Sequence, residues 1–284
     1  MSVKTYFKVT KPHVWSLLVY TGSAGYLIAS GGSIDLTFLL VTVALILGTA
    51  GANTVTSYFD QDIDRIMFRT MNRPIPKGDI SPDSALYYGL LLVFGSVALS
   101  VFINPLVLIF MLIGLFDNII IYSWWSKRRT PLNIILGAPS GGMPTLIGFA
   151  AYSMNLSIDA WILFLLVIVW TPLHIWTLAL KYRDDYIKAN VPMLTSIVDV
   201  EKGIKIIGLS SIILVAFSFL LPFSGEKYMN PIFLGSLIAI NIIILYYTLK
   251  ALIHPSMDVI WRLFKVTSPY LTVIYTAGIL VSIL

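Results

Sequence analysis

Residues 36–58 read LTFLLVTVALILGTAGANTVTSY, a stretch without a single charged side chain. A run of this length is typical of a helix that crosses a lipid bilayer, for which about 18 apolar residues suffice. Similar runs recur along the 284-residue chain, in which 57% of residues are hydrophobic and only 12% are charged. This composition excludes a soluble enzyme and a disordered chain, and it indicates an all-α bundle of helices whose main solvent is the bilayer.

The apolar runs between polar breaks predict nine membrane-spanning helices. Their approximate ranges are 12–30, 36–58, 83–103, 105–125, 131–152, 159–180, 204–223, 231–253 and 266–284. Nine spans leave only short loops, so we expect a polytopic bundle that forms one transmembrane domain over residues 1–284. The chain has no cysteine, which excludes disulfides, thiolate metal sites and a cysteine nucleophile; any metal would need oxygen or nitrogen ligands.

The basic residues predict the orientation of these spans. With nine spans, every Lys and Arg except Lys227 falls on one side of the membrane. The positive-inside rule assigns that side to the cytoplasm of a prokaryotic-type cell, with the N-terminus inside and the C-terminus outside. We expect the N-terminal segment to be retained, because it lacks the small-residue cleavage site of a signal peptide. The net charge of +5 is therefore a topology signal and not a sign of nucleic-acid binding.

One cytoplasmic loop carries carboxylates in helical register. Asn53, Thr56, Asp60 and Asp64 follow one another at intervals of 3, 4 and 4 residues, which places them on one helical face. Carboxylates stacked in this way repel each other by roughly 0.2–0.5 kcal/mol per pair, and a divalent cation removes that conflict. Oxygen ligands without Cys or His nearby are typical of Mg²⁺, which binds one or two carboxylates together with phosphate oxygens of a substrate.

Basic side chains near these carboxylates suit a phosphate group. Arg69 and Arg73, four residues apart, present forked donors that match phosphate oxygens. Lys127 and Arg128 follow the fourth predicted span, where phosphate contact and topology anchoring are equally good interpretations. The plainer alternative for the acidic loop is that its Asp residues only cap and solubilise it, with arginines as surface partners. Asp62 lies off the shared face and suits that role.

A second cytoplasmic loop continues a helix that carries a histidine at membrane depth. His174, Lys181 and Asp185 are 7 and 4 residues apart, so one face leads from the bilayer into a charged loop. Ionisable residues inside a span are candidates for function. A neutral His174 bonded to a backbone carbonyl near Pro172 is an equally plain interpretation. For Asp117, inside the fourth span, we expect a structural hydrogen bond between helices.

Three stretches resemble one family of membrane enzymes. They are DQDIDRIMFRTMNRPIP at 60–76, KRRTPLNIILGAPSGGMPTLIGFAA at 127–151 and WTPLHIWTLALKYRDDYIKANVPML at 170–194. The first is similar to the D-x-D-I-D and R-T-x-x-R-P motifs of the UbiA superfamily of intramembrane prenyltransferases. The other two resemble the protohaem IX farnesyltransferase (haem O synthase) family within it. Quinone-prenylating relatives usually carry a second D-x-x-x-D loop where this chain reads KYRDD at 181–185.

The resemblance implies a reaction and a set of site residues. The reaction transfers a farnesyl group from farnesyl diphosphate to a vinyl group of protohaem IX (haem B) with addition of water, and yields haem O and diphosphate. Asp60 and Asp64 would hold Mg²⁺, which stabilises the charge left on diphosphate. A catalytic role is further expected for Arg183, Asp184 and Asp185, and substrate binding for Asn53, Thr56, Arg69, Arg73, Lys127, Arg128, Lys181 and His174.

Some roles stay open within this resemblance. Asp184 or Asp185 could bind a second Mg²⁺ or order Arg183. His174 is a candidate neighbour of the porphyrin, because imidazole is an ordinary axial ligand of haem iron. The resemblance also implies a partner that accepts the product, for which contact with haem A synthase or a terminal oxidase assembly is the expectation.

Two positions depart from the family pattern. Thr56 stands where the superfamily usually has Asn, so either Thr56 or Asn53 fills that role. Asn190 stands where the family commonly has Gly, and we expect the turn to survive because Asn also tolerates left-handed backbone geometry.

Two rival functions follow from the same residues. The first is a UbiA-type enzyme that prenylates a quinone precursor or a lipid acceptor. The second is a transporter that uses the intramembrane charges as an ion path. Charge is concentrated at one mouth and nearly absent from the other side, which disfavours transport.

Overall fold

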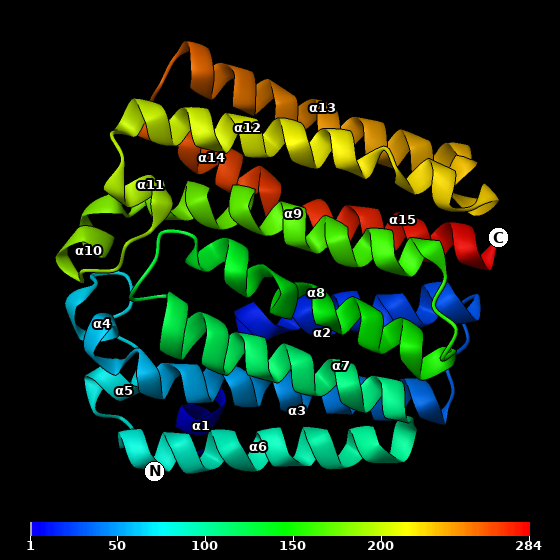
Figure 1. Ribbon diagram of the computed structural model, residues 1–284, viewed down its shortest axis with the longest axis horizontal. Coiled ribbons are helices and arrows are strands. Elements are labelled where there is room, and N and C mark those ends of the chain that lie inside the picture. The colour runs from blue at the N-terminus through cyan, green and yellow to red at the C-terminus, as the bar shows by residue number, and fades with distance from the viewer. Residues whose placement is uncertain (1) are drawn as a thin grey trace.

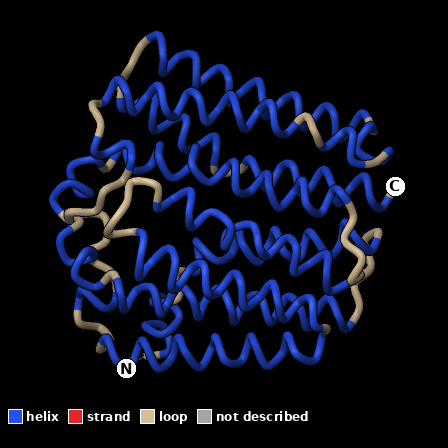
Figure 2. The backbone as a smooth tube through the Cα atoms, in the orientation of Figure 1, coloured by secondary structure: helices blue, strands red, loops and turns tan. Residues whose placement is uncertain are grey.

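The computed structural model describes residues 2–284, and these residues form helices and connecting loops without any strand. Long helices lie side by side in a bundle (Figures 1 and 2). The longer helices are α2 Pro12–Ser30, α3 Leu36–Phe59, α6 Pro82–Ile103, α7 Pro105–Phe116, α8 Asn133–Tyr152, α9 Ile158–Lys181, α12 Val200–Ser218, α13 Pro231–Ile253, α14 Met257–Thr267 and α15 Tyr270–Ile283. The shorter ones are α1 Val3–Val9, α4 Gln61–Ile66, α5 Pro74–Lys77, α10 Arg183–Lys188, α11 Leu194–Ile197 and the 3-10 helices η2 Leu221–Ser224 and η3 Glu226–Met229; the π-helix η1 Asp117–Ser126 directly continues α7.

The predicted all-α membrane bundle is confirmed. Within residues 2–284, eight helical segments are long and apolar enough to cross a membrane. Helix α2 is a ninth long helix and packs against α3, α8 and α15, although its composition is less apolar. Large apolar side chains such as Leu91, Phe94 and Phe102 are exposed on the outer surface, as expected for a protein surrounded by lipid.

The last span differs from the expected one. We predicted a single helix from residue 266, whereas the structure starts α14 at Met257 and breaks the helix at Ser268 and Pro269 before α15. The α14 segment contains Asp258, Arg262 and Lys265, and charges at this density predicted a polar loop. In the structure these side chains are exposed while the opposite face of α14 is buried, so this helix is amphipathic.

The short helices gather at one end of the bundle. In Figure 1, α4, α5, α10 and α11 lie together at the left end, while the C-terminus lies at the right end. Helix α10 ends at Lys188, and Asn190 two residues later has a left-handed φ of 53°, so the expected turn is present without glycine. Lys227, the basic residue expected on the other side, lies near the start of α9 and pairs with Asp159 at 3.0 Å.

Two helices in the centre of the bundle approach each other closely. A Cβ atom on Gly148 of α8 would lie 1.9 Å from the carbonyl oxygen of Gly22 in α2 and 2.8 Å from the backbone nitrogen of Tyr26. Small residues permit this contact, as is common between membrane helices. Helix α8 is also tied to the α7–η1 segment, because the backbone N–H of Ser140 donates to Asp117 at 2.9 Å. That bond is the expected helix–helix role of Asp117.

The close contact makes a prediction about stability. Gly148→Ala should destabilise the protein by about 3 kcal/mol, because a methyl group overlaps the α2 backbone, which cannot move aside as a side chain could. Gly235→Ala in α13 is the matched control, because nothing lies within 4 Å of its added Cβ atom. The control should be neutral or slightly stabilising. Thermal unfolding in detergent measures both variants, and equal midpoints would contradict this packing.

Candidate functional site

The central carboxylates lie where α3 ends. Asp60 is the C-terminal cap of α3, and α4 begins at the next residue. The backbone N–H of Asp64 donates to the Asp60 carbonyl at 2.8 Å, so the two residues stay one helical turn apart. Both residues are only 3% exposed. The predicted register therefore holds at this pair, and it lies at the end of a membrane span.

Each of these carboxylates has a basic partner. Lys127 Nζ lies 2.6 Å from Asp60 Oδ2. Arg73 Nη1 donates to both oxygens of Asp64 at 2.9 Å. Burial is the largest single influence and lowers the pKa of Lys127, but Asp60, Tyr122 and Asp64 together outweigh burial and raise that pKa. The loop after η1 thus brings Lys127 to the acidic loop 67 residues earlier in the sequence.

Lys11 joins this cluster, which the sequence analysis missed. Lys11 lines a small pocket together with Asp64 and Arg73. Burial and then Arg73 lower the pKa of Lys11 to about 7, although Asp64 and Asp60 act in the opposite direction. An anion that entered the site would favour its charged form. The sequence feature that could have indicated this position is Pro12. Proline favours the first position of a helix, so it sets the start of α2 and leaves Lys11 at the mouth of the bundle.

Asp62 and Arg128 form a separate pair beside the cluster. The two outer guanidinium nitrogens of Arg128 each lie 2.7 Å from one Asp62 oxygen, and Nη2 also donates to the Phe59 carbonyl at 2.6 Å. The hydrogen bond from Arg128 lowers the pKa of Asp62 to about 2. Asp62 is exposed, as expected for a residue off the shared face. Arg128 therefore braces the acidic loop.

The loop after α9 contacts the acidic loop after α3 at Arg69. The backbone N–H of Arg69 donates to Asp185 Oδ2 at 3.3 Å, and the Arg69 guanidinium lies 5.6 Å from the centre of the Tyr182 ring. The other candidates of this loop are more dispersed: Lys181 ends α9, Asp184 is exposed, and Arg183 donates to the Val198 carbonyl at 3.1 Å. The structure thus brings Asp185 to the acidic loop, while Arg183 bonds toward the start of α12.

The donors around Asp60 and Asp64 fit Mg²⁺ that is shared with a substrate. Asp60 Oδ1 is buried and has no hydrogen-bond partner in the described chain. Within residues 2–284, no three Asp, Glu or His side chains are grouped as a complete metal site. Two carboxylates with a free oxygen suit a cation that takes its remaining ligands from phosphate and water.

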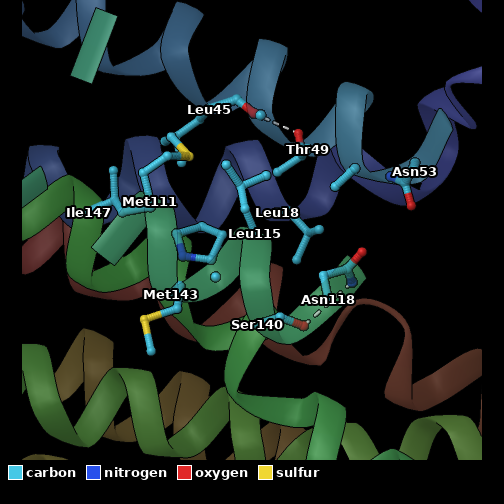
Figure 3. A pocket seen from close by; sticks show the side chains of 14 residues that line it. Leu18, Leu45, Thr49, Asn53, Met111, Leu115, Asn118, Ser140, Met143 and Ile147 are labelled. Carbon is cyan, nitrogen blue, oxygen red and sulfur yellow. Dashed lines mark hydrogen bonds between the residues drawn. The ribbon is translucent and has the colours of Figure 1, made fainter. Parts of the chain in front are cut away.

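An apolar cavity lies within the bundle (Figure 3). Its volume is about 50 Å³, and it lies between α2, α3, the α7–η1 segment and α8. Leu45, Met111 and Ile147 supply apolar lining, and Asn53 and Asn118 are among its few polar residues. Thr56 is not among the residues that line it, and its hydroxyl donates to the Asn53 carbonyl at 3.1 Å. Of the two residues left open by the sequence, Asn53 faces the cavity.

A bundle with paired carboxylates at one mouth and an apolar cavity inside matches a known family. The sequence model of the UbiA prenyltransferase family matches residues 18–269. This chain belongs to the UbiA prenyltransferase family.

Individual relatives agree with this membership. The protoheme IX farnesyltransferase of Thermoplasma acidophilum is 46% identical over 275 residues, which cover 95% of this chain and 94% of the relative. A solved digeranylgeranylglyceryl phosphate synthase is similar in fold, with a TM-score of 0.81 and 23% identity over 99% of this chain and 98% of that one. A UbiA homolog from Archaeoglobus fulgidus, solved with DMAPP and Mg²⁺, has a TM-score of 0.65 and 15% identity over 96% of this chain and 98% of that one.

His174 lies at a different place in this UbiA bundle. Its ring stacks between Trp170 and Phe264, with ring centres 4.5 Å away on each side. Its Nδ1 lies 2.8 Å from the Thr267 hydroxyl oxygen, so its partner is a side chain and not the expected backbone carbonyl. His174 does not line the cavity of Figure 3. The stack orients the imidazole and leaves Nε2 as the ring atom for another ligand.

Proposed function

We propose that this UbiA-family chain is a protohaem IX farnesyltransferase. It converts protohaem IX, farnesyl diphosphate and water to haem O and diphosphate. The observation that carries the proposal is the pairing of Asp60 with Lys127 and of Asp64 with Arg73 at the end of α3, a helix that also lines the apolar cavity. The relative from Thermoplasma acidophilum, similar over nearly its full length, bears the same name.

The basic residues stabilise the leaving group. When the allylic C–O bond breaks, negative charge develops on diphosphate, and preorganised cations at that position lower the barrier. Lys127 and Arg73 balance the two buried carboxylates, and an entering anion favours the charged form of Lys11, whose pKa is about 7. Because Lys127 and Arg73 already point at the carboxylates, they need little reorganisation to exchange these partners for phosphate oxygens.

Asp60 and Asp64 would hold Mg²⁺ in this enzyme. Bound Mg²⁺ supplies Lewis-acid stabilisation of the diphosphate charge. The unpartnered Asp60 Oδ1 supports this assignment, as does the Archaeoglobus UbiA homolog, which was solved with DMAPP and Mg²⁺. Asp185 approaches the same loop through the Arg69 backbone, so we assign it, rather than the exposed Asp184, to the ordering of the diphosphate site.

The cavity and His174 would receive the two organic substrates. The apolar lining suits a farnesyl tail and excludes bulk water from the carbocation. We assign His174 Nε2 to the haem iron. We further propose that residues 1–284 form one prenyltransferase domain with the N-terminus and the diphosphate site on the cytoplasmic side. Contact with haem A synthase or a terminal oxidase assembly stays a prediction.

Product mass tests the proposed reaction. The purified protein should convert haem with farnesyl diphosphate and Mg²⁺ to a haem enlarged by one farnesyl group and one hydroxyl group. Parallel reactions with 4-hydroxybenzoate, dihydroxynaphthoate and a glycerol lipid examine the rival acceptors. Prenylation of one of these with unmodified haem would contradict the proposal, as would ion uptake by proteoliposomes without any release of diphosphate.

The acidic loop makes a sharper prediction. Asp60→Asn and Asp64→Asn should each lower turnover by at least about a hundredfold, the size of losing one preorganised electrostatic contact to a transition state. Asp62→Asn is the matched control from the same loop and should retain most activity, because Asp62 is exposed and Arg128 still donates to the Phe59 carbonyl in this variant. Diphosphate release in membranes with equal protein content measures all three. Full activity of either buried-site variant would remove the Mg²⁺ assignment.

His174 predicts a separate effect on haem. His174→Ala should weaken haem binding and shift the Soret absorption of the bound haem, while the affinity for farnesyl diphosphate stays near the wild-type value. The reason is that His174 packs against α14 and away from the paired carboxylates. Haem titration followed by absorption spectroscopy measures this effect. An unchanged spectrum and an unchanged haem affinity would contradict the assignment.

A further inference from the structure

Two amide groups in the cavity have atoms without partners. Asn53 Nδ2 on α3 and Asn118 Oδ1 on η1 are buried and make no hydrogen bond within the described chain. Both residues line the same cavity and lie at the same end of it in Figure 3. One atom is a donor and the other is an acceptor. Because buried polar groups are rarely left unpaired, this pair of atoms points to a small ligand that can both accept and donate.

The rest of the lining narrows the chemistry of this ligand. Among residues 2–284, no charged side chain lines the cavity, which argues against a metal ion or a phosphate at this point. Ser140 also lines the cavity, but its hydroxyl donates to the Gly137 carbonyl at 2.7 Å and its oxygen lies 3.5 Å from Asn118 Nδ2. Water needs two to four polar partners in a buried site, and Asn53 Nδ2 and Asn118 Oδ1 supply two.

The two amides lie where the reacting carbon would be. Asn53 precedes Asp60 by seven residues on α3, which is about 10 Å along the helix axis. A prenyl chain with its diphosphate at Asp60 and its tail among Leu45, Met111 and Ile147 passes Asn53 with its first carbon atoms. Any water held here would therefore lie close to the newly formed bond.

We propose that Asn53 and Asn118 position the water molecule that adds to the haem vinyl group, an inference that rests on the proposed function. The electron pair of the C–O bond leaves with diphosphate, and the vinyl π electrons form the new carbon–carbon bond. Positive charge then develops on the vinyl carbon next to the porphyrin ring. The oxygen of the held water bonds to that carbon, and its proton passes to the released diphosphate.

The same cation has a second outcome when no water is positioned. It can lose a proton from the neighbouring carbon to diphosphate, which leaves a carbon–carbon double bond in the side chain. That product is lighter than haem O by one water molecule. Asn53 and Asn118 are thus positioning residues that decide between hydration and elimination.

The ratio of the two products tests the inference. Asn118→Leu in the full chain, incubated with haem, farnesyl diphosphate and Mg²⁺, should lower the ratio of hydrated to dehydrated product roughly tenfold, which is the effect of one lost neutral hydrogen bond. Asn53→Leu should shift the ratio in the same direction, and diphosphate release should continue in the Asn118→Leu variant. Asn118→Asp keeps an acceptor oxygen at the same position and should restore most of the ratio.

Ser123→Ala is the matched control. Ser123 lies on the same π-helix, and its buried hydroxyl also lacks a partner, but it does not line the cavity. Its product ratio should equal that of the wild type. Loss of turnover with an unchanged ratio in both Leu variants would mark a structural role and overturn the inference, while farnesylated haem would still support the proposed function. If the wild type forms no farnesylated haem, the proposed function fails first.

Discussion

The structure depends on holding two carboxylates out of water at the end of a membrane span. Asp60 and Asp64 are buried, and a buried charge without a partner is strongly destabilising. Lys127 and Arg73 provide those partners from two other segments of the chain. The Asp60–Lys127 pair therefore fixes the loop after α3 against the loop after η1, while the Asp64–Arg73 pair fixes α4 against the start of α5. The same groups form a charged site that an anion and a cation can enter.

The helices behind this site have a different task. The glycine contact between α2 and α8 sets the distance of closest approach in the centre of the bundle, and the Asp117–Ser140 bond ties α8 to the α7–η1 segment. Between these contacts lies a cavity whose lining has no charge. A charged mouth and an uncharged chamber within one bundle suit a substrate with a polar head and a long apolar tail.

The sequence predicted the parts of this arrangement that depend on local spacing. Helical periodicity predicts that Asp60 and Asp64 lie one turn apart with Arg73 close to them. The cost of charge in a membrane predicts that Asp117 bonds to a neighbouring helix. Lys11 could not be placed, because its role depends on where the start of α2 meets a loop more than 50 residues away. The sequence could not decide whether Asn53 or Thr56 fills the family Asn role. In the structure Asn53 lines the cavity, while the Thr56 hydroxyl bonds to a carbonyl of its own helix. Helix α14 was not predicted, because its charged residues are typical of a polar loop, and the break at Pro269 between α14 and α15 was therefore not predicted either.

The most direct test of the central claim is a crystal structure with Mn²⁺ in place of Mg²⁺ and an uncleavable analogue of farnesyl diphosphate. The account predicts an anomalous metal signal in contact with Asp60 and Asp64 at about 2.0–2.2 Å, with diphosphate oxygens next to Lys127 and Arg73. The tail of the analogue should extend past Asn53 into the cavity. A metal and diphosphate bound elsewhere, with both ion pairs intact, would contradict it.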